Sequence, residues 1–129
     1  TDVGMTPTAG VVAQGGAVGL LWETYALATR EGSARYRVAI TVTRSDQSAL
    51  GAFAARVLDG VGASIGRAQV RRNTLTISFD RTVAAADTHV EALALDMATA
   101  AAGSYRVRVE ITDLVSGKRV ARESPLEVR

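Results

Sequence analysis

The chain has 129 residues, which is the length of one domain. Hydrophobic residues make up 47% of it and charged residues 22%. This composition is typical of a globular protein and excludes a disordered or fibrous one. The net charge is only +2, basic and acidic residues are interspersed, and aromatic residues make up 5%. This pattern argues against nucleic-acid binding, because nucleic-acid-binding proteins gather basic and aromatic side chains on one face. Cysteine is absent, which excludes disulfides and thiolate metal sites, and no apolar run approaches the roughly 18 residues of a membrane-spanning helix.

Residues 1–16 are rich in Thr, Gly and Ala and show no sustained period, which predicts an extended N-terminal arm before a β-sandwich domain at 17–129. Ordering each residue costs about 1–2 kcal/mol of backbone entropy, so we expect the arm to be mobile alone and ordered only over a neighbouring subunit. The alternative is a solvated tail. A start at Thr1 instead of Met favours a processed mature chain over an excised domain. Four apolar residues are candidate anchors of the arm on a partner: Val3, Met5, Val11 and Val12.

Two segments with period-2 alternation follow the arm. In residues 18–27 the lone tryptophan, Trp22, is expected in the core as a structural residue, and the alternative is an exposed ring that stacks on a ligand. In residues 34–44 Tyr36 points inward while Arg35 and Arg37 point outward. Both segments are predicted strands.

The segment from Ser45 to Ile65 is ambiguous. Apolar residues from Leu50 to Val61 recur at helical spacing and predict a short helix around 48–61. Gly51 lies inside this pattern and disfavours a helix by about 1 kcal/mol relative to alanine. The alternative is a strand near 54–58.

The remaining segments, at 74–81, 90–96, 105–111 and 120–128, alternate as strands again. In the third of them Tyr105 and Val107 point to one face, and Arg106 and Arg108 point to the other. Six to seven short strands separated by turn residues predict an all-β fold, an antiparallel β-sandwich.

The C-terminal part carries a resemblance to a known family. In order along the chain it contains Leu93-x-Leu95-Asp96-Met97, Gly103-Ser104-Tyr105, Asp113 and Ser116-Gly117. This pattern resembles the end of bacterial extracytoplasmic immunoglobulin-like or fibronectin-III-like modules. It is particularly similar to the C-terminal β-domain of GWxTD-type secreted proteins, although the GWxTD motif itself is absent.

The resemblance implies an immunoglobulin- or fibronectin-III-like sandwich in a bacterial extracytoplasmic compartment, either the periplasm or the cell surface. It also implies a tyrosine corner, in which the Tyr105 hydroxyl bonds to upstream backbone. Such motifs are structural and recur across many functions, so the resemblance implies no activity.

No constellation of catalytic groups is visible. His89 is the only histidine, and no cluster of carboxylates surrounds it at ligand spacing, so we expect a satisfied or exposed loop histidine and no metal site. A triad of Ser78, Asp87 and His89 lacks a nucleophile-elbow sequence. The sequence therefore predicts a protein that is not an enzyme and holds no cofactor.

Four arginines lie on outward faces of predicted strands, Arg35, Arg37, Arg106 and Arg108. If these strands share a sheet, they form a basic patch for a partner, and the alternative is a solvated face balanced by acids. The sequence predicts a non-catalytic structural or protein-interaction module. It would be an accessory subunit or terminal domain of a larger, membrane-associated extracytoplasmic complex, such as a photosynthetic reaction centre, a respiratory complex or an envelope assembly. Its partners would be other subunits, with the chain peripheral to the membrane.

The alternative function is a carbohydrate- or small-ligand-binding module. In that case Trp22 or Tyr25 would serve as the stacking platform.

Overall fold

The computed structural model describes residues 3–14, 17–45, 57–58, 67–71, 73–96 and 102–128. Within these ranges the regular elements are nine strands, with no helix. The strands, in chain order, are β1 (Gly4–Gln14), β2 (Ala17–Tyr25), β3 (Ser33–Arg44), β4 (Val57–Leu58), β5 (Arg67–Arg71), β6 (Thr74–Ala84), β7 (Thr88–Asp96), β8 (Gly103–Asp113) and β9 (Arg119–Val128).

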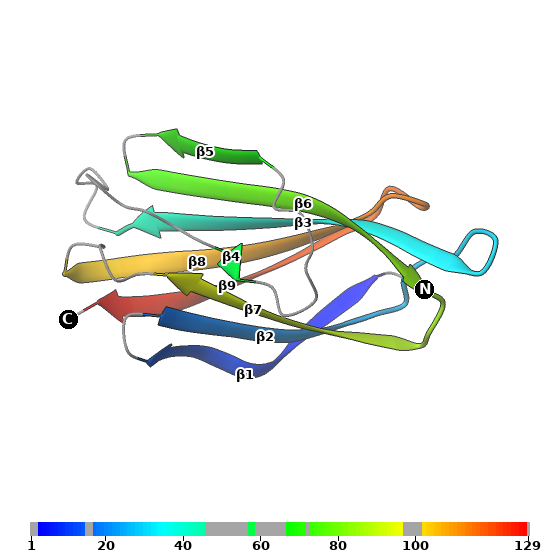
Figure 1. Ribbon diagram of the computed structural model, residues 1–129, viewed down its shortest axis with the longest axis horizontal. Helices are drawn as coiled ribbons and strands as arrows, with labels where there is room; N and C mark the ends of the chain where they lie inside the picture. Colours follow the sequence, from blue (N-terminus) through cyan, green and yellow to red (C-terminus); the bar gives the residue numbers. More distant parts are fainter. Residues whose placement is uncertain are drawn as a thin grey trace.

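The strands form two antiparallel sheets that pack as a β-sandwich (Figure 1). One sheet has the order β1-β2-β7-β4 and the other has the order β5-β6-β3-β8-β9. The predicted all-β sandwich is therefore confirmed. The described residues contain more strands than the expected six to seven, because the N-terminal segment and two short segments also pair.

The core follows from the alternation along the central strands. In β3 every second residue from Tyr36 to Val42 is fully buried, and the polar residues between them face outward. Neighbouring β6 and β8 supply the rest of this layer, and burying each aliphatic side chain stabilises the fold by roughly 1.5–3 kcal/mol. The three aromatic rings expected in the core, Trp22, Tyr36 and Tyr105, are all buried.

The N-terminal segment is part of the domain, which corrects the expectation of an arm at 1–16. β1 pairs with β2 from Gly4↔Tyr25 to Gln14↔Ala17. Two register shifts, on either side of Ala9, break the alternation that would have shown this strand in the sequence. Two of the candidate anchors, Val3 and Met5, are buried in the chain's own core, so they are not available to a partner. The other two, Val11 and Val12, lie in β1, and their side chains are outside the described part.

The expected helix at 48–61 is described at only two residues, and these are extended. Val57 and Leu58 form β4 and pair with Leu95 and Ala94 of β7. At these two positions the chain therefore forms the alternative strand in place of the helix. Backbone N–H and C=O groups must be hydrogen-bonded, and here the edge of the sheet at β7 provides the partners. The rest of 48–61 lies outside the described residues. No helix capable of spanning a membrane occurs among the described residues.

The β8–β9 turn is built around one buried carboxylate, Asp113, which is 1% exposed. Its Oδ1 accepts hydrogen bonds from the backbone N–H groups of Val115 (2.9 Å) and Ser116 (3.2 Å), and its Oδ2 accepts one from Ala28 (2.7 Å). Gly117 adopts a φ of 81°, which glycine tolerates best, and donates to the Asp113 carbonyl. Burial alone would raise the pKa of Asp113, but the backbone donors outweigh it and hold this pKa below its usual value. Asp113 thus fastens the β2–β3 connection to the β8–β9 turn.

Candidate functional site

The four outward arginines lie on one face of the five-stranded sheet, here called the arginine face (Arg35, Arg37, Arg106 and Arg108). β3 and β8 are paired neighbours in this sheet, so the arginines of both strands lie on one surface. The register places Arg106 opposite Thr43 and Arg108 opposite Thr41, while Arg37 lies opposite Thr112. Four residues of strand, about 13 Å, separate Thr41 from Arg37. The arginines therefore form two couples rather than one cluster.

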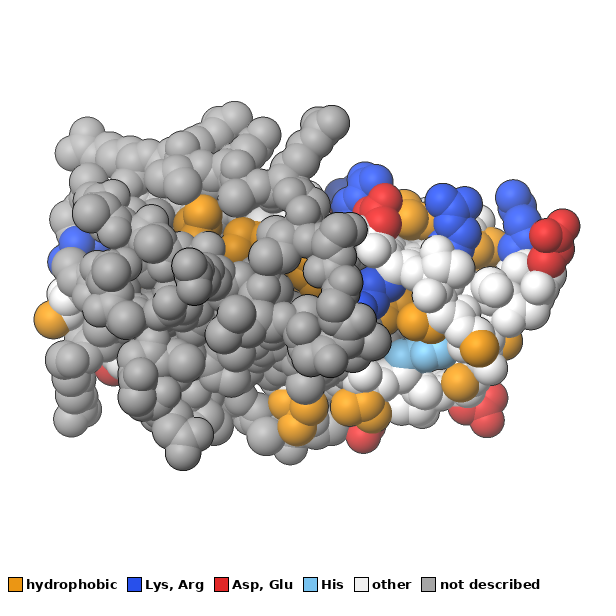
Figure 2. Space-filling view, in the orientation of Figure 1, with side chains coloured by type: hydrophobic (Ala, Val, Ile, Leu, Met, Phe, Trp, Pro, Cys, Tyr) orange, Lys and Arg blue, Asp and Glu red, His pale blue; other side chains and the backbone are white. Residues whose placement is uncertain are grey.

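Acidic side chains pair with three of these arginines. Arg37 contacts Asp80 through two hydrogen bonds, of 2.7 Å and 3.2 Å. Arg108 lies 3.0 Å from Glu110, and Arg106 lies 3.9 Å from Glu123. The hydrogen bond from Arg37 is the main reason why the pKa of Asp80 is lowered. Figure 2 shows charged side chains of both signs side by side along one margin of the molecule.

A band of hydroxyl groups lies beside these charges on the same face. Thr41 and Thr76 approach within 3.4 Å through their Oγ1 atoms, and Thr43 and Thr74 within 3.5 Å. Both pairs join directly opposed residues of β3 and β6. The outer face is thus a polar surface of ion pairs and hydroxyls, rather than the basic patch that arginines alone would make.

A second group of polar residues lies inside the sandwich, and we call Trp22, Thr24 and His89 the interior polar cluster. Thr24 is 0% exposed and Trp22 is 3% exposed. Thr24 of β2 lies directly opposite His89 of β7, and Trp22 is the next residue of β2 on the same face. The buried atoms Trp22 Nε1, Thr24 Oγ1 and His89 Nε2 have no hydrogen-bond partner in the described structure.

The opposite sheet also presents polar groups to this cluster. The rings of Tyr36 and His89 have their centroids 6.4 Å apart, which connects β3 to β7 across the interior. Arg81 of β6 pairs directly with Tyr36 and so lies on the same side of the sheet. Its guanidinium carbon lies 5.2 Å from the centroid of the Phe79 ring. The interior at this end of the sandwich is therefore polar from both sides.

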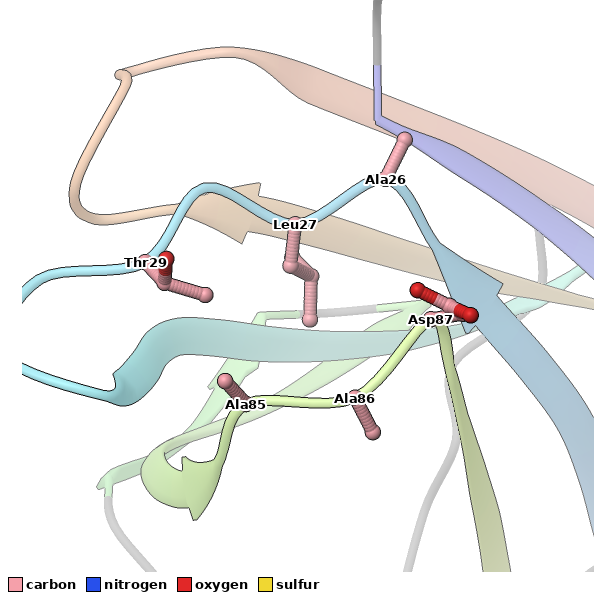
Figure 3. Close-up of a pocket in the computed structure, with 6 residues that line it drawn as sticks. All are labelled: Ala26, Leu27, Thr29, Ala85, Ala86 and Asp87. Carbon is pink, nitrogen blue, oxygen red and sulfur yellow. The ribbon is translucent and has the colours of Figure 1, made fainter.

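A cavity of about 360 Å³ opens at the same end. It lies between the β2–β3 connection, with Leu27, and the β6–β7 connection, with Asp87 (Figure 3). These connections adjoin the strand positions of Thr24 and His89, which are two residues away from Ala26 and Asp87 respectively. Three of the six residues that line it are alanine, so few of its side chains can bind or react with a ligand.

The catalytic groups considered from sequence are not brought together. Ser78 lies opposite Ala39, on the outer side of β6, whereas His89 faces the interior. His89 also belongs to β7, so the expectation of a loop histidine is wrong. Its segment begins two residues earlier than the alternation suggested, because β7 pairs with β2 as far as Thr88. Among the described residues no three His, Cys, Asp or Glu side chains form a group that could hold a metal ion.

Two tyrosines differ in their exposure. Tyr25 is 40% exposed, and its ring lies so close to Gly4 that a Cβ at Gly4 would be 2.0 Å from the ring. Tyr105 is buried, with the Arg44 guanidinium 5.9 Å from the centre of its ring. The predicted bond from the Tyr105 hydroxyl to upstream backbone stays a prediction.

Sequence reasoning did not single out the interior polar cluster as a site. The available signal was a threonine, Thr24, in phase with Trp22 on the inward face of the first predicted strand. Its neighbour His89 could be recognised only once β2 and β7 were known to pair.

Comparison with protein-family models and with curated proteins gave no match to this chain.

Proposed function

We propose that this chain is a non-catalytic β-sandwich module that binds other protein subunits in an extracytoplasmic, membrane-associated assembly. The observation that carries the proposal is the arginine face, where arginines are held on a rigid sheet over a fully buried core. Arginine is enriched in protein interfaces, because its planar group pairs with carboxylates in a defined geometry.

The couple on β8 is the better candidate contact. The Arg106 side chain is 64% exposed, and its 3.9 Å distance to Glu123 leaves donors available to a partner carboxylate. Arg37 is held by two bonds to Asp80, so recruiting it would require that pair to be broken. We therefore assign partner contact first to Arg106 and then to Arg108, which is held by one bond to Glu110 (3.0 Å) where Arg37 is held by two, with Arg35 and Arg37 at the margin.

Capture from solubilised native membranes tests this proposal. The tagged chain should retain partner subunits, and the double variant Arg106→Glu, Arg108→Glu should release them, because the new carboxylates repel those of the partner. Arg30→Glu, at an exposed position in the β2–β3 connection, is the matched control and should retain them. Recovery of free monomer from the unmodified chain would count against the proposal.

We further propose that the sandwich is of the immunoglobulin or fibronectin-III type and lies in a bacterial periplasm or on the cell surface. The buried Tyr105 after Gly103 and the Asp113-x-x-Ser116-Gly117 turn support this type. Fractionation of the native protein tests the location, since recovery in the cytoplasmic fraction would contradict it.

A second function, carbohydrate binding, is favoured by Tyr25 alone. Its ring is exposed and is fixed against Gly4, as expected of a platform on which a sugar stacks. Trp22 cannot serve in this way, because its ring is buried. Tyr25→Ala should abolish binding to a glycan array, and an array on which the unmodified chain binds nothing would exclude this role.

A further inference from the structure

Two large hydrophobic side chains are exposed among the described residues, Tyr25 (40%) and Val90 (63%), and they lie on the same surface. Val90 is paired with Glu23 in the β2–β7 ladder, and Tyr25 is two residues further along β2. The two side chains are therefore diagonal neighbours, about 7 Å apart. They face outward, because Thr24 between them on β2 is fully buried. Exposed apolar residues are ordinary when scattered, but neighbouring ones indicate a contact surface.

The cavity of about 360 Å³ begins where this ladder ends. Tyr25 and Thr88 form the last pair of β2 and β7, and the connections beyond them line opposite walls of the cavity. β2 ends here because Ala26 takes a φ of 60°, a left-handed conformation that interrupts an extended strand. The exposed pair and the cavity thus adjoin each other, and we call this surface the end patch (Glu23, Tyr25, Val90 and the cavity).

The end patch carries negative charge that the chain itself leaves unpaired. Glu23 is half-buried beside the exposed pair, and Asp87 lines the cavity. Within the described part of the chain, no hydrogen bond or ion pair engages either carboxylate. On the five-stranded sheet, by contrast, the carboxylates of Asp80, Glu110 and Glu123 each contact an arginine. The carboxylates of the end patch are therefore available to an external cation.

Two basic residues belong to the elements around the cavity. Arg81 of β6 has an interaction of its own within the chain. Arg30 follows Thr29 in the β2–β3 connection, where Glu31 is its next neighbour in sequence. Neither arginine is among the described residues that line the cavity. Asp87 is the charged group of that lining, so the cavity favours a positive ligand.

The shape of the cavity selects the kind of cation. Its volume lies at the lower end of the roughly 300–1,000 Å³ of ligand pockets, which is room for a single side chain. Figure 3 shows Leu27 extending from one connection toward Ala85 and Ala86 of the other, with Asp87 at one end. Apolar walls with one carboxylate match a side chain that has an aliphatic stem and a charged tip. Lysine and arginine are the two side chains of this form.

We propose that the end patch docks a segment of a partner protein in which a lysine or arginine is flanked by apolar residues. The aliphatic stem packs on Leu27 and the alanines, and the cationic tip pairs with Asp87. The flanking apolar residues cover Tyr25 and Val90. A sugar can stack on Tyr25, but Val90 beside it offers no hydrogen bond, which favours a peptide.

This inference rests on the proposed role in binding other subunits and adds a second contact to it. The two contacts lie on opposite outer faces of the sandwich and differ in charge. The arginine face belongs to the sheet of β3 and β8, and the end patch belongs to the sheet of β2 and β7. The arginine face therefore meets carboxylates of a partner, and the end patch meets a cation.

Peptide titration of the full chain, followed by the backbone amide signals in NMR spectra, tests the inference. The probe is a leucine-lysine-leucine peptide blocked at both ends, compared with its arginine and glutamine counterparts and with butylammonium. The amides of Tyr25, Asp87 and Val90 should shift together and saturate with the lysine and arginine peptides. The glutamine peptide should bind at least about tenfold more weakly, the value of one hydrogen bond to a charged group.

Two variants and a matched control assign the binding to the end patch. Asp87→Asn should weaken binding of the lysine peptide at least about tenfold, because it removes the counter-ion. Val90→Ala should weaken it about fourfold or more, the value of one buried methylene group. Glu31→Gln removes an exposed carboxylate from the neighbouring β2–β3 connection and should leave affinity nearly unchanged, because water and salt screen its charge. Equal losses in Asp87→Asn and Glu31→Gln would indicate general attraction only and overturn the assignment.

The remaining outcomes separate this inference from its rivals. Equal binding of the glutamine peptide would contradict a cation site, and equal binding of butylammonium would mean that the cavity takes free amines and no partner segment. If no peptide moves these signals, the inference is wrong, and a neutral oligosaccharide that moves them instead would assign the surface to carbohydrate. The double variant Arg106→Glu, Arg108→Glu should bind the peptide as the unmodified chain does, so a failure of this titration is distinct from a failure of partner capture by the arginine face.

Discussion

Two regions of this sandwich bury polar groups, which are hydrogen-bonded within the chain in one region and have no hydrogen-bond partner in the other. At the β8–β9 turn, the carboxylate of Asp113 accepts three backbone hydrogen bonds and is fully satisfied within the chain. In the interior polar cluster, Trp22, Thr24 and His89 each bury a polar atom without a partner. A self-satisfied group contributes to stability, whereas an unsatisfied one reduces it and favours any ligand that completes it.

The difference arises from how each region is assembled. Two of the bonds to Asp113 come from residues two and three positions later, so a local turn motif creates most of its environment. The interior polar cluster is brought together from β2 and β7, far apart in sequence. Local motifs of the first kind serve the fold, and unsatisfied cross-strand groups are the better candidates for binding.

The largest expected effect is the loss of Asp113. Asp113→Ala should destabilise the fold by about 3 kcal/mol or more, because it leaves three backbone N–H groups without their acceptor. Urea unfolding measures this difference. Asp80→Ala is the control, since it removes an exposed carboxylate from the Arg37 pair and should cost no more than about 1 kcal/mol. Equal losses of unfolding free energy in the two variants would show that the buried, hydrogen-bonded Asp113 contributes no more than an exposed carboxylate.

The second prediction concerns acid. Because the folded-state pKa of Asp113 lies below its usual value, its contribution is complete above the unfolded pKa, about 3.9, and is lost as the pH falls through the folded pKa. Asp113→Asn keeps an acceptor oxygen but cannot titrate, so it should destabilise less than Asp113→Ala at neutral pH. It should also flatten the decline in unfolding free energy below about pH 4. A decline as steep as that of the unmodified chain would show that other carboxylates cause it.

The third prediction concerns Tyr105, whose ring is buried beside Arg44. Tyr105→Phe should destabilise the fold by about 1 kcal/mol, the net value of one hydrogen bond, if the hydroxyl bonds to backbone as in a tyrosine corner. Thermal unfolding of the two chains provides the measurement. No change in stability would contradict the corner while leaving the buried ring in place.

These regions also show what the sequence could and could not predict. The alternation in β3 and β8 is strict, because each has one buried and one outer face, and it predicted both strands and the outward arginines. β1 was missed, since its register shifts near Ala9 interrupt the period. Thr24 and His89 could not be linked from sequence, because cross-strand pairing depends on the topology of the whole chain.

The smallest predicted effect has an unusual sign. Thr24→Val replaces a buried hydroxyl that has no partner with a methyl group of the same shape. Its removal should leave stability unchanged or raise it by up to about 1 kcal/mol, because no hydrogen bond is lost and a desolvation penalty disappears. Thr41→Val, which removes an Oγ1 placed 3.4 Å from that of Thr76, should instead lose a few tenths of a kcal/mol.

Thermal unfolding of the unmodified chain and of the two variants measures both differences. A Thr24→Val chain that is strongly destabilised would show that the hydroxyl is already satisfied within the fold, and the contrast with Asp113 would not hold.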